Sequence, residues 1–298
     1  MTKSESESDP RILAAVVTFN RIELLKRSVN ALRGQTRPPS LILVIDNTST
    51  DGTAAWLDEQ SDLKVIRQPN SGSAGGCYSA ARFGYDEGFD WIWMMDDDTI
   101  PGPTALERLV VSPAFGRGDT GFVYSLQVYP DGTVPVNDPA ATSPNEWALT
   151  VVKERCIPVK VCSFVAVMVS RHAIGKVGYP MKEMFFMGDD HEFTRRITSN
   201  GFRGFCVLDS VVLHDTKLPA EFTYRAWSPV KKRYSMRNHV YLIRTSPYSS
   251  TRKVRYLAAI FLTEMARVFT GASSPIMVFW GIKGLFFNPT AERPKARP

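Results

Sequence analysis

Four apolar runs in the first hundred residues constrain the fold more than any other feature of the sequence. The run 12–17 is continuous rather than alternating, which is typical of a parallel strand buried on both faces. Segments with helical patterns separate the runs, and strands that alternate with helices indicate an open, mostly parallel α/β sheet. The four runs cover residues 12–17, 41–45, 63–66 and 91–95.

Polar residues follow every one of these runs. Right-handed crossovers bring the carboxyl ends of parallel strands to the same edge of a sheet, and ligands bind at that edge. We therefore expect these polar side chains to form one site. They are Thr18, Asn20, Asp46, Asn47, Asn70 and the triplet Asp96, Asp97 and Asp98.

The rest of the chain is less regular. Strands are expected at 121–128 and 207–213, an apolar run at 161–169, a loop at 131–146, and a helix that begins near the acidic cluster 188–193. Two apolar helical stretches follow, near 257–269 and 276–287. The predicted division is a disordered leader (1–10), an α/β domain (11–216, with two halves at 11–100 and 101–216) and a basic, helical C-terminal region (217–298).

Charge is distributed unevenly. The net charge is +6, but residues 217–298 carry 15 Lys and Arg against 3 Asp and Glu, so this region has +12 and the remainder −6. A basic region rich in Trp and Phe suits the surface of an anionic membrane, and no nucleic-acid-binding motif accompanies it. We therefore expect contact with a membrane and none with nucleic acid; packing on the α/β domain or on a second copy in a homo-oligomer is the alternative.

Location can also be predicted. The first ten residues have no apolar run of the kind that a secretory signal needs, and no stretch of 18 uncharged apolar residues occurs. The four cysteines form no C-x-x-C pair, which favours a reducing compartment. The expectation is a cytoplasmic protein that is peripheral at the inner face of the cytoplasmic membrane.

The aspartate triplet is the strongest chemical signal. Three adjacent carboxylates repel one another, and a divalent cation such as Mg²⁺ or Mn²⁺ removes that cost. In an extended segment Asp96 and Asp98 point to the same side. The alternative is a solvated acidic turn that caps the next helix.

Five motifs together resemble the family 2 glycosyltransferases with the GT-A fold, over residues 11–215. They are Val-Val-Thr-Phe-Asn-Arg (16–21), Val-Ile-Asp-Asn-Thr-Ser-Thr-Asp-Gly-Thr (44–53), the Asn/Gly-rich loop (70–76), Trp-Met-Met-Asp-Asp-Asp-Thr-Ile-Pro (93–101) and Gly-Asp-Asp-His-Glu-Phe (188–193). The loop and the triplet resemble most the bacterial galactofuranosyltransferases and rhamnosyltransferases.

This resemblance implies a Rossmann-like GT-A domain whose triplet holds a divalent cation against the diphosphate of a nucleotide sugar. His214 would complete the metal site, although a lone histidine at a strand end is often only hydrogen-bonded. The loop glycines would let the backbone approach the nucleotide, or form a plain strand-to-helix turn. The implied nucleotide-sugar-binding residues are Thr18, Asn20, Asp46, Asn47, Asn70, Gly72, Gly75, Gly76, Asp96 and Asp97, and the implied metal ligands are Asp96, Asp98 and His214.

The second acidic motif matches the element that supplies the catalytic base in inverting members of the family. The resemblance places the base at Asp190, with Asp189 as a neighbour that positions the acceptor or tunes the base. A carboxylate there takes the proton of the acceptor hydroxyl as its oxygen attacks. The alternative is capping of a helix by either aspartate, because acids favour first turns.

The sequence thus predicts a metal-dependent inverting glycosyltransferase that uses a nucleotide diphosphate sugar and a glycan or lipid-linked glycan acceptor of the cell envelope. UDP-galactofuranose is the expected donor, and dTDP-rhamnose is the alternative. A non-catalytic module that binds nucleotide or nucleic acid is the alternative from another class. A nucleotidyltransferase is disfavoured, since residues 18–21 lack the Gly-rich loop of those enzymes.

Overall fold

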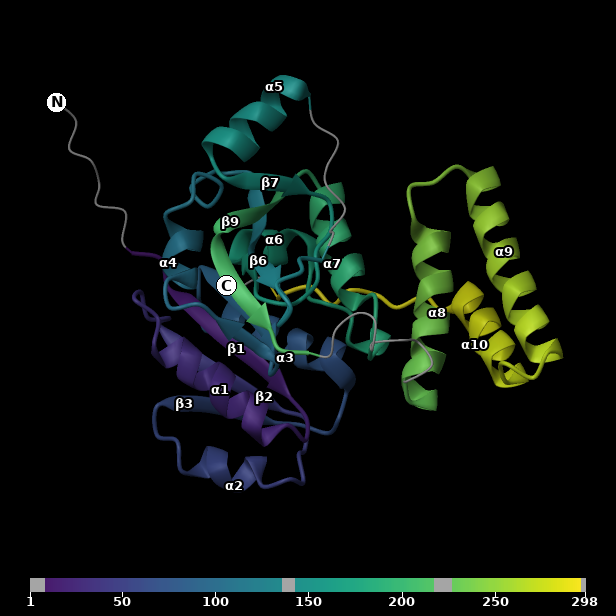
Figure 1. Cartoon of the computed structure of the whole chain (residues 1–298), viewed down its shortest axis with the longest axis horizontal. Helices are drawn as coiled ribbons and strands as arrows, with labels where there is room; N and C mark the ends of the chain where they lie inside the picture. Colours follow the sequence, from purple (N-terminus) through teal and green to yellow (C-terminus); the bar gives the residue numbers. More distant parts are fainter. Residues whose placement is uncertain (1–8, 136–142, 217–226, 296–298) are drawn as a thin grey trace.

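One central sheet organises the computed structural model, which describes residues 9–135, 143–216 and 227–295. Nine strands of the described chain form this sheet, in the order β3-β2-β1-β4-β8-β6-β9-β5, with β7 paired to β9. Figure 1 shows the sheet flanked by helices, with a separate group of helices to one side. The strands are β1 Ile12–Thr18, β2 Leu41–Asp46, β3 Leu63–Arg67, β4 Trp91–Asp96, β5 Thr99–Pro101, β6 Thr120–Val128, β7 Cys156–Val159, β8 Val167–Ser170 and β9 Arg203–His214.

The four strands expected from the apolar runs are present and parallel. β1 pairs with β2 and with β4, and β2 pairs with β3. In this register Thr18 lies opposite Asp46, and Val17 lies opposite Asp96. The polar strand ends therefore meet at one edge of the sheet, as the sequence predicts.

The second half of the sheet is mixed. β8 runs antiparallel to both β4 and β6, and β5 and β7 run antiparallel to β9. The pairing of β5 with β9 places His214 opposite Thr99, next to the triplet. Within the apolar run 161–169, Ala166 adopts a left-handed φ of 56° and the strand β8 begins only at Val167.

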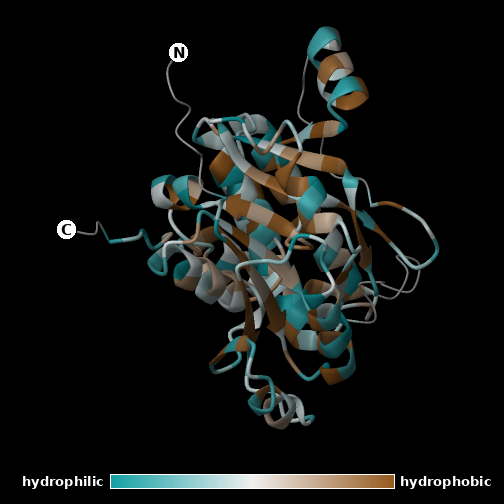
Figure 2. Ribbon diagram, turned by 90° about the vertical axis from the view of Figure 1, so that its left-hand side faces the viewer, coloured by the Kyte–Doolittle hydropathy of each residue, from teal (hydrophilic) through white to brown (hydrophobic). Residues whose placement is uncertain are grey.

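Helices cover both faces of the sheet. Alternate residues of β1 belong to two separate buried clusters, one on each side, which confirms strands buried on both faces. Figure 2 shows the strands as mostly hydrophobic segments inside this layered arrangement. The helices of the α/β domain are α1 Ile22–Arg33, α2 Thr53–Asp58, α3 Gly72–Asp86, α4 Ala105–Val110, α5 Pro144–Trp147, α6 Arg171–Val177 and α7 Asp189–Ser199, with the helical turns η1 Ala148–Lys153 and η2 Lys182–Met184.

The basic C-terminal region is helical, as expected. It consists of α8 Pro229–Thr245, α9 Ser250–Phe269 and α10 Pro275–Phe286. Ser228, Ser249 and Ser274 each cap one of these helices by accepting a hydrogen bond from a backbone N–H group of the first turn. None of the helices in the described part of the chain has the length and apolar character needed to cross a bilayer.

After α10 the chain returns to the α/β domain, which the sequence did not indicate. The backbone N–H of Tyr179 donates to the carbonyl of Glu292, and the Tyr78 hydroxyl donates to the Glu292 carboxylate. The segment after α10 is therefore anchored to the α/β domain. The predicted leader lies, except for Asp9 and Pro10, outside the described residues.

Candidate active site

The triplet occupies a tight turn at the centre of the polar edge. Asp96 ends β4, and Asp97 and Asp98 form the turn that leads into β5. The expected extended geometry, with Asp96 and Asp98 on one side, is therefore wrong. The turn has a physical cause, because Asp97 and Asp98 reach different partners on β1 and β9.

Thr18 at the end of β1 and Arg21, just before α1, hold the turn. The Thr18 hydroxyl donates to Asp97 Oδ2 (2.8 Å), and Arg21 Nη1 donates to Asp97 Oδ1 (3.1 Å) and Asp98 Oδ2 (2.9 Å). Both aspartates are buried. Sequence reasoning quoted Arg21 within a motif but gave it no role; its place three residues after a strand end is the signal that could have found it.

The pKa values of the three aspartates in the triplet differ strongly from their ordinary value. Burial, and then the neighbouring Asp98 and Asp97, raise the pKa of Asp96 to about 7. Burial likewise raises the pKa of Asp97 to about 6, against the opposing effect of Arg21. Burial acts on Asp98 in the same direction, but His214 and Arg21 together outweigh it and lower its pKa. The turn is thus a compact acidic centre that adjacent cations only partly compensate.

His214 lies beside Asp98 of the triplet. Its Nε2 is 3.4 Å from Asp98 Oδ1, and that buried oxygen accepts no hydrogen bond within the described structure. The buried His214 Nδ1 likewise has no hydrogen-bond partner there. Tyr129 stacks on the imidazole with ring centroids 5.6 Å apart.

These residues fit a divalent cation only with help from a ligand. In the described chain no three His, Cys, Asp or Glu side chains are gathered around a common point that could hold a metal ion. A cation that bridges a diphosphate needs only one or two protein ligands, because phosphate oxygens supply the rest. The unpaired oxygen of Asp98 and the adjacent His214 meet that requirement.

The second strand end forms a polar recess beside the triplet. Asp46 is 1% exposed; its Oδ1 accepts the N–H of Ser49, and its Oδ2 is buried without a hydrogen bond. Asn47 donates from Nδ2 to the carbonyl of Gly72 (3.2 Å). Asn20, with a left-handed φ of 53°, accepts the N–H of Thr50 (2.6 Å) and so shapes the neighbouring loop.

The Asn/Gly-rich segment is largely helical. α3 begins at Gly72, within the segment 70–76 that the sequence analysis treats as a loop, and Asn70 Oδ1 accepts the N–H of Gly72 (3.0 Å). Gly75 and Gly76 are buried in the first turns of the helix. A Cβ on Gly76 would collide with Val17 of β1, so the close packing of α3 on β1 requires glycine at this position. Its role toward the nucleotide stays a prediction.

The acidic pair begins α7 as predicted. Gly188, at a φ of 84°, precedes Asp189, which is 3% exposed and has a buried Oδ2 with no hydrogen bond. Asp190 is half-buried, and its Oδ1 accepts the N–H of His191 (2.7 Å). Burial raises the pKa of both carboxyl groups; Asp189 is raised well above its ordinary value, with Asp190 as the next cause.

The triplet and the acidic pair converge on the first turns of α3. Burial is the main cause that raises the pKa of the Cys77 thiol, and Asp96, Asp189 and Asp190 all add to it. Asp96 also raises the pKa of Asp189. Two acidic elements that lie almost a hundred residues apart are therefore both within electrostatic reach of Cys77, and Asp96 and Asp189 are within reach of each other.

The C-terminal region brings a cation close to this site. Lys231 of α8 lies over the ring of Phe186, with Nζ 4.5 Å from the centroid. Burial, followed by Arg21, lowers the pKa of Lys231, while the three aspartates of the triplet act in the opposite direction. Lys231 thus stands within electrostatic reach of the triplet.

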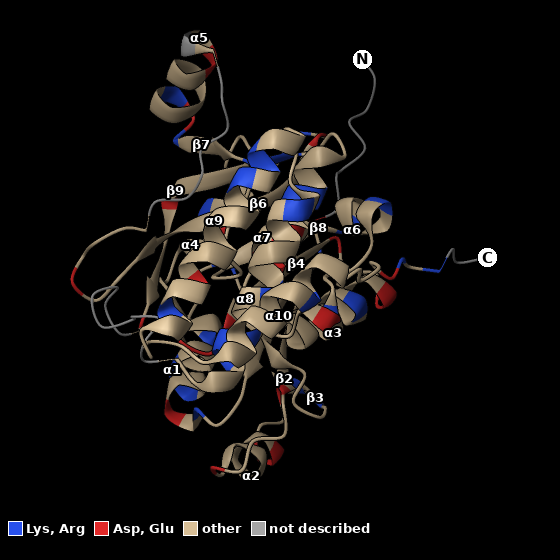
Figure 3. Cartoon of the chain, turned by 90° about the vertical axis from the view of Figure 1, so that its right-hand side faces the viewer, with Lys and Arg blue, Asp and Glu red and all other residues tan. Residues whose placement is uncertain are grey.

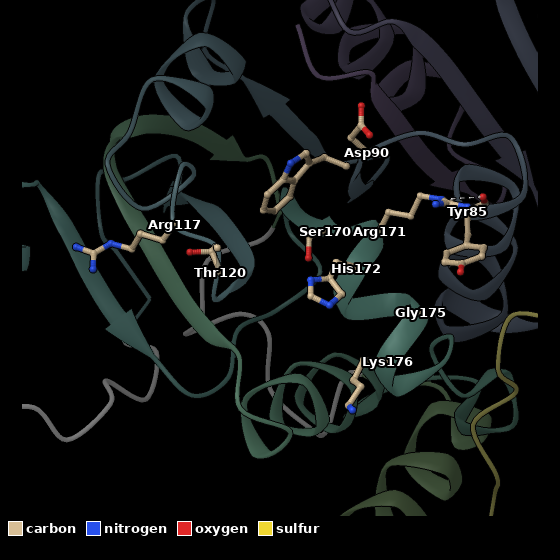
Figure 4. Close-up of a pocket in the computed structure, with 11 residues that line it drawn as sticks. Tyr85, Asp90, Arg117, Thr120, Ser170, Arg171, His172, Gly175 and Lys176 are labelled. Atoms are coloured by element: carbon tan, nitrogen blue, oxygen red, sulfur yellow. Dashed lines mark hydrogen bonds between the residues drawn. The ribbon is translucent and has the colours of Figure 1, made fainter. Parts of the chain in front are cut away.

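A separate cavity lies at the opposite, amino-terminal edge of the strands. Tyr85, Trp91, Arg117, Arg171, His172 and Lys176 are among the residues that line it. Figure 4 shows that the Arg117, Arg171 and Lys176 side chains point apart rather than toward a common centre. Arg117 pairs with Glu154, and Arg171 donates to the carbonyl of Tyr85 (3.2 Å), so both guanidinium groups are already engaged.

The chain is similar to curated glycosyltransferases along much of its length. It is 26% identical over 224 residues to galactofuranosyltransferase GlfT1 of Mycobacterium tuberculosis, which covers 68% of this chain and 69% of that one. It is 35% identical over 105 residues to undecaprenyl-phosphate mannosyltransferase of Micrococcus luteus, covering 34% of this chain and 43% of the relative. The latter match spans less than half of the relative's length.

Solved structures share the fold at low identity. GalNAc-T7 in complex with UDP, GalNAc and Mn²⁺ superimposes with a TM-score of 0.60 at 17% identity, covering 78% of this chain and 48% of that one. The mannosyltransferase PcManGT of Pyrobaculum calidifontis, in complex with GDP-Man and Mn²⁺, gives a TM-score of 0.54 at 16% identity and covers 94% and 85%. These likenesses confirm the GT-A fold.

The family model named Glycosyl transferase family 2 matches residues 14–178, which include β1 to β8 and the aspartate triplet. More than half of the chain lies within that match. The expected family is therefore confirmed: this chain belongs to glycosyltransferase family 2 and is a glycosyltransferase with the GT-A fold.

Proposed function

We propose that this enzyme is a metal-dependent, inverting galactofuranosyltransferase that uses UDP-galactofuranose and a glycan or lipid-linked glycan acceptor of the cell envelope. The observation that carries the proposal is the convergence of the triplet and the acidic pair around Cys77. A donor held at the triplet would present its anomeric carbon to the acidic pair. The choice of sugar is supported by the mycobacterial relative, whose match covers two thirds of each chain.

The donor site in this proposal follows the polar strand ends. Asp46, Asn47, Thr18 and Asn20 face the nucleoside, and the start of α3 with Asn70, Gly72, Gly75 and Gly76 approaches it from the other side. Asp96 and Asp97 contact the ribose and diphosphate. Asp98 and His214, with Asp96, hold Mn²⁺ or Mg²⁺, and a bound cation would neutralise the charge that develops on the departing diphosphate.

Asp190 acts as the general base. The acceptor hydroxyl oxygen forms a bond to the anomeric carbon while the bond from that carbon to the diphosphate oxygen breaks. The hydroxyl proton passes to the Asp190 carboxylate, and the nucleoside diphosphate leaves with the bonding electrons. Asp189 is its buried neighbour, and since the charge of Asp190 helps to raise the pKa of Asp189, Asp190 is the carboxyl group of the pair that ionises more readily.

Asp190→Asn tests this assignment. The amide keeps the shape of the carboxyl group but cannot take the proton, so transfer should fall by about 10²–10⁴-fold. Binding of UDP with Mn²⁺, measured by calorimetry, should stay within a few-fold of the wild type. Retention of near wild-type transfer would rule out Asp190 as the base.

The sugar is tested by a screen of UDP-galactofuranose, dTDP-rhamnose and GDP-mannose for hydrolysis and transfer, with and without Mn²⁺. GDP-mannose belongs in the screen because one relative is a mannosyltransferase. Turnover confined to UDP-galactofuranose and dependent on the metal supports the proposal. Salt-sensitive binding of DNA without metal-dependent binding of UDP would favour the non-catalytic module instead.

The C-terminal helices also suit an anionic membrane. Leu262, Met265 and Phe269 on α9 are 68%, 56% and 95% exposed, and Phe279 and Phe286 on α10 are 52% and 76% exposed. Figure 3 views the molecule from this side and shows Lys and Arg along the helices with few acidic residues. An apolar stripe with basic neighbours on helices too short to cross a bilayer is typical of interfacial binding.

A further inference from the structure

The loop before the acidic pair is held in a costly backbone conformation. Phe185 and Met187 have φ values of 64° and 67°, and Gly188 has a φ of 84°. Residues with a side chain rarely adopt this left-handed region, and such strain persists only where the surroundings fix it. Asp189 follows at once, so whatever fixes this loop also sets where α7 and its aspartates begin.

Asn238 of α8 is the side chain that fixes it. Its Nδ2 donates to the carbonyl oxygens of Met184 (2.8 Å), Phe186 (3.0 Å) and Met187 (2.8 Å), and the residue is 1% exposed. An amide nitrogen carries two hydrogens, so three acceptors must share them. One buried side chain thus satisfies three carbonyls of a strained loop.

The orientation of this amide is chemically determined. Asn238 Oδ1 accepts hydrogen bonds from Arg237 Nε (3.0 Å) and Nη2 (2.8 Å). In the reversed orientation the amide oxygen would face three carbonyl oxygens and the amide nitrogen would face a guanidinium group. Neither pair can form a hydrogen bond, so this orientation is excluded. Arg237 Nη2 also donates to the carbonyls of Glu183 (2.6 Å) and Met184 (3.2 Å), so it holds the same loop.

The remaining carbonyl of the loop faces the donor side. Phe185 O accepts the N–H of Ala74 at the start of α3 (3.3 Å), and a Cβ on Gly72 would collide with that oxygen. The loop is therefore clamped between the segment proposed to contact the nucleotide and a helix of the C-terminal region. Arg195 extends the clamp along α7 by donating to the carbonyl of Leu242 (3.2 Å).

We infer that Asn238 is a positioning residue for the catalytic base: through the 184–187 carbonyls it sets the place of Asp190 relative to the donor. The inference rests on the proposed role of Asp190. A displacement of about 1 Å in a reacting group can cost on the order of 10²-fold in rate, so loss of this clamp should act on catalysis more than on donor binding.

The experiment compares Asn238→Asp and Asn238→Ala with Asn200→Ala. The aspartate keeps the shape of the amide but has no N–H to donate, whereas Asn200 donates only to a carbonyl of its own helix. With UDP-galactofuranose and Mn²⁺, both Asn238 variants should lower kcat for transfer by about 10–100-fold and change the donor KM by less than about three-fold. Asn200→Ala should match the wild type.

Two further readouts separate positioning from mere stability. Amide hydrogen exchange should rise in residues 182–190 of the Asn238 variants and stay unchanged in residues 70–76. Transfer should also fall more than hydrolysis of the donor by water, because a small nucleophile depends less on precise alignment. An equal fall in both reactions, unchanged kcat, or variants that lose UDP binding or fail to fold would overturn the inference and leave Asn238 a folding residue.

The result can be read independently of the proposed function. If Asp190→Asn retains transfer, the base is misassigned whatever the Asn238 variants do. If Asp190→Asn loses transfer while the Asn238 variants do not, only the positioning role fails. Protection of the 182–190 amides by Asn238 is measurable without any substrate.

Discussion

Arg21 allows three adjacent aspartates to share one buried turn. Its guanidinium spans Asp97 and Asp98, and these carboxylates together with Asp96 raise the pKa of Arg21 against the effect of burial. A buried carboxylate without a partner is strongly destabilising, so the turn needs such a counter-charge when no cation is bound. The triplet therefore carries more negative charge than Arg21 balances, and a bound cation would balance the rest.

Burial of the Asp189 carboxyl group has a cost in folding stability that can be tested. Burial, and then Asp190, raise its pKa well above the ordinary value. A carboxyl group whose folded pKa exceeds its unfolded pKa contributes its stability below about pH 4 and loses it as the pH rises through the folded pKa. The buried Asp189 carboxyl group should therefore destabilise the fold at neutral pH relative to its value near pH 4.

Asp189→Asn should consequently raise the melting temperature at pH 8, by about 2–4 °C for each kcal/mol released. The difference from the wild type should shrink as the pH falls toward 4, where both side chains are neutral. Thermal melts across this pH range measure it. Asp86→Asn, at a side chain that is 55% exposed, is the control and should show no such trend. A gap that stays constant with pH would contradict the assignment.

At the scale of elements, the contact between α3 and β1 brings the donor loop to the strand ends. A Cβ on Gly76 would collide with Val17 Cγ1 and lie 2.8 Å from its Cγ2. Gly76→Ala should therefore push α3 away from the sheet and lower the free energy of unfolding by about 1–3 kcal/mol. Binding of UDP with Mn²⁺ should weaken in parallel.

Urea denaturation and calorimetry measure these two effects. Gly118→Ala is the matched control, because a Cβ there meets nothing within 4 Å and the backbone is not left-handed. An alanine at position 76 that leaves stability unchanged would mean that the helix can shift freely. If UDP binding alone were lost, the glycine would serve the nucleotide directly.

The parallel half of the fold could be predicted because each of its strands is a largely apolar run with its own local sequence signal. β5 and β8 have three and four residues and depend on partners far along the chain, so periodicity could not find them. The position of His214 was visible as the end of an apolar run. Its approach to Asp98 follows from the β5–β9 pairing, which no local pattern reveals.

The same limit applies to the candidate site. Asp190 and the triplet could be named from motifs, whereas the clamp by Asn238 joins residues more than fifty positions apart through main-chain carbonyls. Any residue supplies a carbonyl, so those acceptors leave no trace in the sequence. Interactions of this kind become apparent only when α8 is seen beside the loop.

At the scale of the whole molecule, the helical unit formed by α8, α9 and α10 has two proposed roles. Its first helix holds the loop before the proposed base, and its other two helices expose an apolar stripe. Figure 1 shows α8 between the α/β domain and α9, with the chain returning to the domain after α10. In this arrangement an enzyme docked on a membrane through α9 and α10 would keep its acidic pair on the membrane side of the sheet.

Docking itself is testable with vesicles that contain phosphatidylglycerol. Replacing Leu262 and Phe269 by Ser removes two exposed apolar side chains, and each should weaken binding by about ten-fold or more if it is buried in the lipid interface. Val111→Ser, at a residue of the α/β domain that is 64% exposed, is the control and should bind like the wild type.

Co-sedimentation with anionic and with neutral vesicles measures the effect, and high salt should weaken the wild-type interaction because basic residues contribute to it. Unchanged vesicle binding in the double variant would contradict a membrane contact at this stripe. A dimer in the wild type that dissociates in the double variant would instead assign the stripe to a second copy of the chain.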